Sequence, residues 1–411
     1  MTRSPSALSP YLRALTIEGL RCFSAPQTLS LTTDGLPARW TILLGDNGVG
    51  KTTLLQLLAY LRPSATALSV EFGAEPCLAV AGYAGFVWRP WVRVGDDGLR
   101  EGRATLRVGV SAGLREAPVF EGEVGETWLS EAAPLREIPS APVAIPEAPI
   151  VRSLVVAYGP YRRLRRGQLQ ASAAPEAHVA GLFDPEAPLV PAEEWFLQRD
   201  YAASKLAAGT LEHARARGAL ERVTRLLRSI LPEVDALEAV IPDPTTGGAQ
   251  LVARTRQGTV PVGDLGLGYQ ATLAWVTDLA ARMTAAYPDS ENPLAEPAVV
   301  LVDEIDLHLH PRWQRGLLEQ LSAQFPNVQW VVTAHSPLIV QNAPPDSQIA
   351  VLRWEGDHVV IDNDPAHVRD WRLDQILTSD LFGLPSARPK RLDALIEEHD
   401  RLLGKPAQPA G

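Results

Sequence analysis

A glycine-rich segment with one lysine and two threonines, GDNGVGKTT, occupies residues 45–53. It fits the pattern G-x-x-x-x-G-K-[ST], with the apolar run RWTILLG before it and a leucine-rich stretch of helical spacing after it. Glycines in this context let backbone N–H groups surround phosphates, and the following helix adds its positive dipole end. Lys51 is expected to neutralise the β and γ phosphates of ATP, and the Thr52 hydroxyl to bind Mg²⁺. The predicted cofactor-binding residues are Gly45, Asp46, Asn47, Gly48, Val49, Gly50, Lys51, Thr52 and Thr53.

Two further apolar runs end in residues that could complete this chemistry. AVVLVDE is typical of a central buried strand that delivers Asp303 and Glu304 to its carboxyl end, where ligands bind in open α/β sheets. Asp303 is expected to hold Mg²⁺, and Glu304 to act as the general base that polarises the attacking water. VVTAHSP ends a second such strand with His335, which could hydrogen-bond the γ-phosphate or that water.

Two other segments have competing interpretations. His308 and His310 in DLHLHP could bind a metal, but two histidines at this spacing without a third ligand form a poor zinc site, which favours surface or interface residues. DLGLGYQ, residues 264–270, is either a plain glycine turn before a helix or a segment whose backbone N–H groups and helix N-terminus reach a phosphate.

Short apolar strands that alternate with helical patterns predict an α/β fold of the P-loop type with a doubly wound core sheet. Its strands are expected from both ends of the chain, with an antiparallel β lobe and a helical insertion between them. The predicted divisions are an N-terminal ATPase lobe over 1–112, a Pro/Ala-rich loop or insertion over 113–150, a helical and β-meander insertion over 151–262, a C-terminal ATPase lobe over 263–360 and a C-terminal helical segment over 361–411.

Composition limits the possible partners and compartments. The formal net charge of −10 argues against a chain that coats nucleic acid by charge alone. The segment YRRLRRG contains a local cluster of arginines: Arg162, Arg163, Arg165 and Arg166. It is either a solvated face or salt-bridge cluster, or a phosphate-contacting surface. No apolar run approaches a membrane span, the first residues lack a signal peptide's apolar core, and the two cysteines have no metal-ligand spacing. These features predict a cytoplasmic protein without a membrane partner.

Together these motifs resemble the ABC-type ATPase heads of the SMC, RecF and OLD group, over roughly residues 11–62 and 255–345. GDNGVGKTT, DEIDLHLHP and TAHSP are similar to the Walker A, Walker B with D-loop, and switch-histidine segments of that group. The resemblance implies that Asp306, in the D-loop, contacts the nucleotide and that Arg21, in LTIEGLRCF, lies near the phosphates. It also implies that DLGLGYQ is the signature, with Gly266 in the serine slot, and that Gly268 and Gln270 approach ATP on a second head. The magnesium-sensing glutamine has no assigned match, although Gln168 and Gln170 follow the right kind of strand.

The resemblance implies an ATPase that forms a head-to-tail homodimer around two ATP molecules. Coil-less heads of this kind look like the ATPase subunits of Septu-like or retron-associated anti-phage systems, which regulate a separate effector such as a nuclease. Two alternatives stay open. One is a RecF-like DNA-repair clamp, which needs a continuous basic surface. The other is a nucleotide-gated scaffold with negligible turnover, which Gly266 in place of serine would suit.

Overall fold

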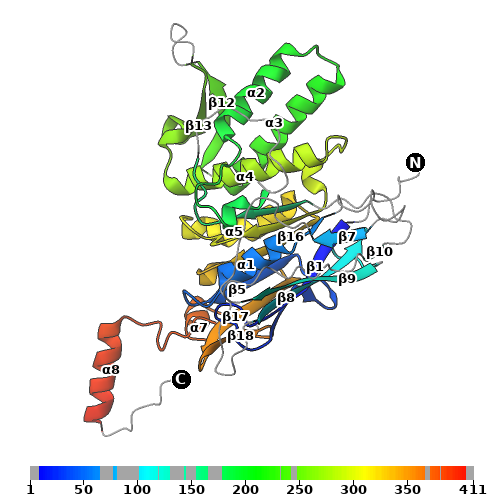
Figure 1. Ribbon diagram of the computed structural model, residues 1–411. Coiled ribbons are helices and arrows are strands. Elements are labelled where there is room, and N and C mark those ends of the chain that lie inside the picture. Colours follow the sequence, from blue (N-terminus) through cyan, green and yellow to red (C-terminus); the bar gives the residue numbers. More distant parts are fainter. Residues whose placement is uncertain are drawn as a thin grey trace.

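The computed structural model describes residues 9–64, 77–80, 101–118, 120–129, 143–144, 154–164, 178–231, 233–241, 248–365, 371–379 and 381–403. A mostly parallel sheet lies at the centre of this part of the chain, in the order β11-β15-β16-β5-β17-β18 (Figure 1). Only β18 pairs antiparallel, at one edge. The strands are β5 (Trp40–Gly45), β11 (Val155–Tyr158), β15 (Ala298–Val302), β16 (Val328–Thr333), β17 (Ser347–Glu355) and β18 (His358–Asp362). The predicted α/β core, built from both ends of the chain, is confirmed.

Both faces of this sheet are buried because successive residues of each strand enter opposite hydrophobic cores. In β5, Ile42 and Leu44 join one core, while Leu43 joins the other. Trp40 stacks on Trp330 of the neighbouring strand, with ring centroids 4.9 Å apart. The helices nearest the sheet are α1 (Lys51–Tyr60), α4 (Leu267–Ala286), α5 (Pro311–Gln324) and α6 (Pro337–Gln341). Short 3-10 turns are η2 (Ala180–Leu182), between β11 and α2, η3 (Val262–Asp264), before α4, and η4 (Pro293–Ala295), before β15.

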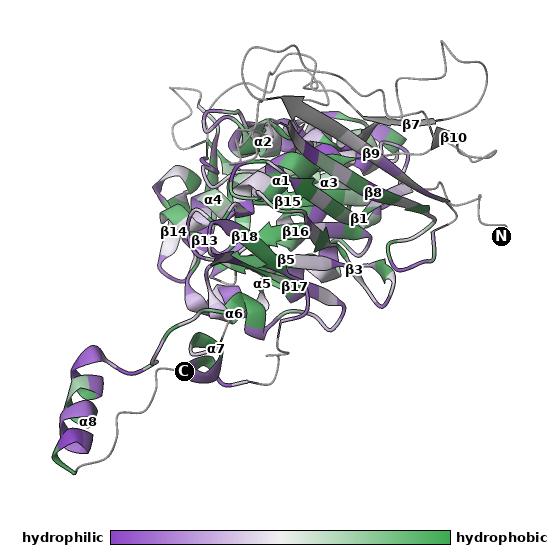
Figure 2. Cartoon of the chain, turned by 60° about the horizontal axis from the view of Figure 1, so that its bottom comes forward, coloured by the Kyte–Doolittle hydropathy of each residue, from purple (hydrophilic) through white to green (hydrophobic). Residues whose placement is uncertain are grey.

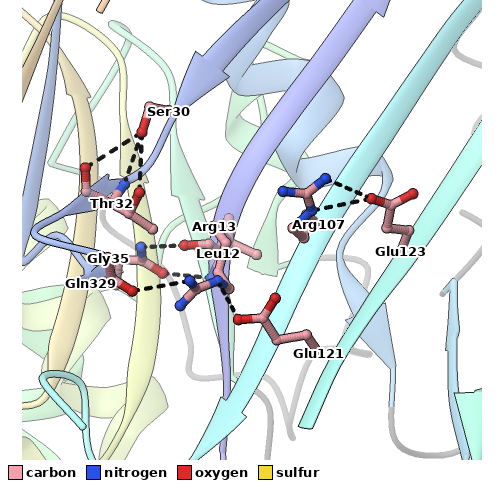
Figure 3. Close-up of polar contacts among 9 residues, drawn as sticks. All are labelled: Leu12, Arg13, Ser30, Thr32, Gly35, Arg107, Glu121, Glu123 and Gln329. Atoms are coloured by element: carbon pink, nitrogen blue, oxygen red, sulfur yellow. Dashed lines mark hydrogen bonds and ion pairs between the residues drawn. The ribbon is translucent and has the colours of Figure 1, made fainter. Parts of the chain in front are cut away.

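An antiparallel sheet in the order β2-β1-β8-β9 covers the face of the core sheet that carries α1. Gln329 of β16 ties the two sheets together, because its side chain accepts from Leu12 N and donates to Leu12 O, both at 2.8 Å (Figure 3). Across the antiparallel sheet, Arg13 pairs with Glu121 at 3.1 Å. The strands outside the core sheet and before residue 150 are β1 (Ser9–Glu18), β2 (Gln27–Ser30), β3 (Thr32–Thr33), β4 (Leu36–Pro37), β6 (Pro63–Ser64), β7 (Cys77–Val80), β8 (Glu101–Ser111), β9 (Phe120–Leu129) and β10 (Val143–Ala144).

A helical pair and a small antiparallel sheet lie over the opposite face, together with α4 (Figure 1). They comprise α2 (Ala192–Lys205), α3 (Leu211–Ile230), β12 (Val234–Val240), β13 (Gln250–Thr255) and β14 (Gly258–Pro261). The sequence predicts two helices in this region, separated near Gly209 and Gly218. Gly209, at a φ of +93°, does lie between α2 and α3. The break near Gly218 is wrong, because α3 runs through it and buries Ala219 and Val223 on the same side of the helix.

The last described elements are α7 (Leu373–Leu377) and α8 (Lys390–Leu402). Helix α8 stands apart from the rest of the chain, with purple and green faces of opposite hydropathy (Figure 2). None of its residues is buried. Among the described residues, no helix is long and apolar enough to cross a bilayer.

Two features of the predicted divisions are corrected by the structure. Residues 120–129, placed in a Pro/Ala-rich loop, form strand β9 paired along β8. In this segment Val124 and Trp128 are separated by small or acidic residues, which is a pattern typical of a strand. The Pro- and Ala-rich composition around it favoured a loop instead. Strand β11, placed in an insertion, belongs to the core sheet beside β15. The division into domains otherwise stays a prediction.

Candidate nucleotide-binding and catalytic site

The glycine-rich loop joins the carboxyl end of β5 to the start of α1. Gly45 has a φ of +136°, and a Cβ there would meet the Leu352 carbonyl oxygen at 2.3 Å. Gly50, at a φ of +90°, is the residue before the helix, and a Cβ there would meet the Cys22 and Phe23 side chains. Both positions therefore require glycine, and the loop brings backbone N–H groups to the positive end of α1.

Lys51 lies over this loop with its side chain almost fully buried. Its Nζ donates to the carbonyl oxygens of Gly45 at 2.6 Å and Asp46 at 2.8 Å. Burial lowers the pKa of Lys51, while the nearby carboxylates, Asp303 foremost, act in the opposite direction. An ammonium group that is desolvated and faces the cavity is suited to neutralise phosphate oxygens.

Thr52 and Asp303 meet although 251 positions separate them in the chain. The Thr52 hydroxyl donates to Asp303 Oδ2 at 2.7 Å, and the Thr333 hydroxyl donates to Oδ1 at 2.6 Å. Thr333 is fully buried at the end of β16 and was missed by the sequence analysis, because one threonine in an apolar strand carries no signal. A hydroxyl and a carboxylate oxygen held together at the helix start form an all-oxygen donor set, which fits Mg²⁺.

Glu304 directly follows Asp303 with a left-handed backbone, at a φ of +51°. A non-glycine residue in this region is strained by about 1–3 kcal/mol, so other contacts must hold it. Its N–H donates to Thr333 Oγ1 at 2.7 Å. Its carbonyl oxygen accepts from Arg162 Nη2 at 2.7 Å. The left-handed turn directs the Glu304 side chain to the cavity that Lys51 and Thr52 line.

Arg162 is a residue whose role the sequence analysis misjudged. The Arg-rich segment was interpreted as a solvated face or a phosphate-contacting surface, but Arg162 is only 6% exposed. Its Nη1 donates to Gly159 O at 3.0 Å and to Asp303 O at 2.6 Å. Burial lowers the pKa of Arg162 to about 10, with Asp303, Glu304 and Asp306 opposing the shift, so the guanidinium stays charged at neutral pH. Arg163 is exposed, and Arg165 and Arg166 lie outside the described residues.

His335 follows the end of β16, and its side chain lines the same cavity as Glu304. Its backbone N–H donates to the Asp306 carboxylate, with the nearer oxygen at 3.1 Å. Asp306 thus orients the loop that presents His335, which is a different contact from the nucleotide contact predicted for it. This hydrogen bond links the loop after β15 to the loop after β16.

The cavity has a volume of about 680 Å³, within the usual range for small-molecule sites. It collects predicted residues from all three loops and also Arg21, whose Nη1 donates to the Thr53 hydroxyl at 2.8 Å. Trp354 and Asp357, on the hairpin of β17 and β18, line it too and were missed. The lining residues are Arg21, Cys22, Asn47, Gly48, Gly50, Lys51, Thr52, Thr53, Asp303, Glu304, His335, Trp354 and Asp357.

The DLGLGYQ segment forms the start of α4 and does not line this cavity in the described part of the chain. Gly266 is the residue before the helix and is exposed, as is Leu267. Gln270 stabilises the turn within the chain, because its Nε2 donates to Gly263 O at 2.9 Å and Leu265 O at 2.6 Å. Nucleotide contact by Gly266, Gly268 and Gln270 stays a prediction that needs a second molecule.

Gly268 has a packing reason to be glycine. A Cβ there would meet the His308 carbonyl oxygen at 2.3 Å, so Gly268→Ala forces the backbone to shift and is expected to destabilise the fold by about 1–3 kcal/mol. At Gly266 the nearest group is the Tyr269 ring at 3.8 Å, so Gly266→Ser is expected to leave the thermal midpoint unchanged. Calorimetry of the two variants checks this, and equal midpoints would contradict the packing argument.

His310 caps α5, since its Nδ1 accepts from Arg312 N at 3.2 Å. Within the described residues, no group of three or more His, Cys, Asp or Glu side chains could hold a metal. The local structure therefore accounts for His310 through helix capping.

The parallel sheet, the phosphate-binding loop at β5 and the acidic pair at the end of β15 define a P-loop ATPase. The chain belongs to the family described as AAA domain, putative AbiEii toxin, Type IV TA system, whose model matches residues 41–341.

Curated relatives share parts of this chain. Retron Ec83 probable ATPase of Escherichia coli is 42% identical over 89 residues, 22% of this chain and 16% of that protein. Septu protein PtuA of Bacillus mycoides (strain KBAB4) is 25% identical over 374 residues, 90% of this chain and 44% of that protein. The match therefore covers less than half the length of these relatives. The solved SMC head domain from Thermotoga maritima aligns with a TM-score of 0.41 at 11% identity, over 87% of this chain and all of that one, which is too low to support a functional argument.

Proposed function

We propose that this protein hydrolyses ATP with Mg²⁺, dimerises head-to-tail on ATP and regulates a separate effector protein in bacterial anti-phage defence. The observation that carries the proposal is the shared cavity, in which Glu304 and His335 face Lys51 and Thr52. The phosphate-binding loop follows β5, Asp303 and Glu304 follow β15, and His335 follows β16. The sheet brings these three loops to one edge.

Each residue has a distinct task in this proposal. Lys51 and the loop N–H groups bind the phosphates, and Thr52 with Asp303 would hold Mg²⁺, which supplies charge neutralisation on the phosphate oxygens. Glu304 accepts the proton of the attacking water, and His335 orients the γ-phosphate of ATP through a hydrogen bond. Neither Arg162 nor Thr333 lines the cavity; both fix the backbone that carries Asp303 and Glu304.

A dimer is proposed because residues 264–270 of a single chain do not reach its own nucleotide site. The cavity has no lining from residues 264–270 within the described structure, while Leu267 at the start of α4 is 68% exposed. A second copy arranged head-to-tail would bring these N–H groups and the positive end of α4 to the γ-phosphate. Each copy would then complete the other's site.

Defence is proposed because relatives are named as Septu and retron proteins, one of which aligns over 90% of this chain. The effector, expected to be a nuclease, is proposed by analogy with the family. Arg162 would not contribute to the basic surface that a DNA clamp needs, because it is buried beneath the acidic pair.

Leu267→Glu tests the dimer directly. The substitution places a charge at an exposed position that the proposal buries between copies, so ATP-dependent dimerisation is expected to weaken by about tenfold or more. Monomer affinity for ATP should stay unchanged, because Leu267 does not line the cavity of its own chain.

Light scattering with and without ATP gives the dimer fraction, and isothermal titration calorimetry gives the nucleotide affinity. Leu211→Glu, an exposed leucine at the start of α3, is the matched control. Dimerisation of Leu267→Glu as strong as that of the control would contradict the head-to-tail arrangement.

A further inference from the structure

The nucleotide cavity has two ends, which are lined from strands on opposite sides of β5 in the core sheet. Strands β15 and β16, which present Asp303, Glu304 and His335, lie on one side of β5. Strand β17 lies on the other side, with Leu352 directly opposite Gly45. Two residues beyond that point, Trp354 reaches the same cavity from the side away from the acidic pair.

A nucleotide also has two chemically different ends, its phosphates and its base. Its phosphates belong beside Lys51, Thr52 and Asp303, because these are the groups that neutralise charge. The base must then occupy the other end of the cavity, which Trp354 and Asp357 line together with the turn that carries Arg21. An indole face is suited to stack on a planar base, whereas it offers nothing to hydrated phosphates.

Trp354 is held in place although its ring is accessible. It shares one face of β17 with Leu352 and lies opposite Val359 of β18, and both of those residues are buried. The Val359 N–H donates to Cys22 O at 2.9 Å, which fastens the hairpin to the turn beside the loop. Trp354 remains 51% exposed, an unusual exposure for the largest apolar residue.

We propose that Trp354 is the platform on which the base of the bound nucleotide stacks. This inference rests on the proposed nucleotide site and adds the group that recognises the base. It makes part of the affinity for ATP depend on a residue outside the phosphate-binding loop and outside the acidic pair.

The test compares ATP with inorganic tripolyphosphate, which keeps the phosphate contacts and lacks the base and the ribose. By isothermal titration calorimetry with Mg²⁺, Trp354→Ala is expected to weaken ATP binding by about tenfold or more, on the scale of one base–aromatic stack. Affinity for tripolyphosphate should change by less than about twofold, because the phosphate end is untouched. Trp354→Phe keeps a ring and should lose only part of the ATP affinity.

Tyr201→Ala provides the matched control, because Tyr201 is an exposed aromatic residue on α2 that does not line the cavity. Circular dichroism and the thermal midpoint of each variant verify that it folds. Unchanged ATP affinity in Trp354→Ala, an equal loss for both ligands, or a loss confined to dimerisation would overturn the inference. Wild-type protein that binds neither ligand would instead refute the proposed nucleotide site itself.

Discussion

Glu304→Gln is expected to abolish ATP turnover while ATP binding is retained. A glutamine has nearly the same shape as glutamate and keeps the turn geometry, but it cannot accept the proton of the attacking water. Losing a general base lowers turnover by about 10²–10⁴-fold. Because the Glu304 backbone is held by Thr333 and Arg162 through main-chain atoms, the substitution leaves those contacts intact.

Phosphate release under saturating ATP measures turnover, and light scattering measures the dimer. A variant that binds but does not hydrolyse ATP should accumulate as the ATP-bound dimer, whereas the wild type cycles. Glu319→Gln, an exposed position on α5, is the control for the loss of one carboxylate. Turnover within about twofold of wild type would remove Glu304 from the role of base. If the wild type itself released no phosphate, the scaffold alternative would stand.

Motifs that lie within one short segment were predictable from the sequence. The loop from Gly45 to Thr53 and the acidic pair after β15 follow from a strand, a turn and a helix that are adjacent in the chain. Parallel strands place their carboxyl ends at one edge, so the convergence of Asp303 and His335 on Lys51 followed from fold class alone. The structure places these residues around one cavity.

Contacts set by tertiary packing were not predictable. Trp354 lies in β17, which pairs with β5, a strand about 300 positions earlier in the chain. The sequence around Trp354 does not indicate which face of β17 lies beside the phosphate-binding loop. Thr333 looks like any residue of a buried strand. The sequence YRRLRRG suggested a surface, since charged residues rarely enter a core unless they are paired, and the partners of Arg162 include the carbonyl groups of Asp303 and Glu304, which are distant in sequence.

Arg162→Ala is expected to lower the turnover number by about 100-fold with little change in ATP affinity, because displacement of catalytic groups by about 1 Å costs a factor of this size. The Arg162 guanidinium clamps the Asp303 and Glu304 carbonyl oxygens at 2.6 and 2.7 Å. Without it the strained Glu304 turn can relax, and its carboxylate leaves the position that faces the cavity. The phosphate-binding loop makes none of these contacts, so binding should persist.

Two variants separate positioning from general destabilisation. Removing the guanidinium takes a donor from the carbonyl oxygens of Gly159, Asp303 and Glu304, so Arg162→Ala should also lower the free energy of unfolding by about 2–5 kcal/mol. Arg162→Lys keeps a charge that can reach one carbonyl, and we expect intermediate turnover. Arg163→Ala changes the exposed neighbour and should match wild type in both measurements. If Arg162→Lys restored stability and turnover to wild-type values, a planar two-carbonyl clamp would not be required, and any buried cation there would position Glu304 equally well.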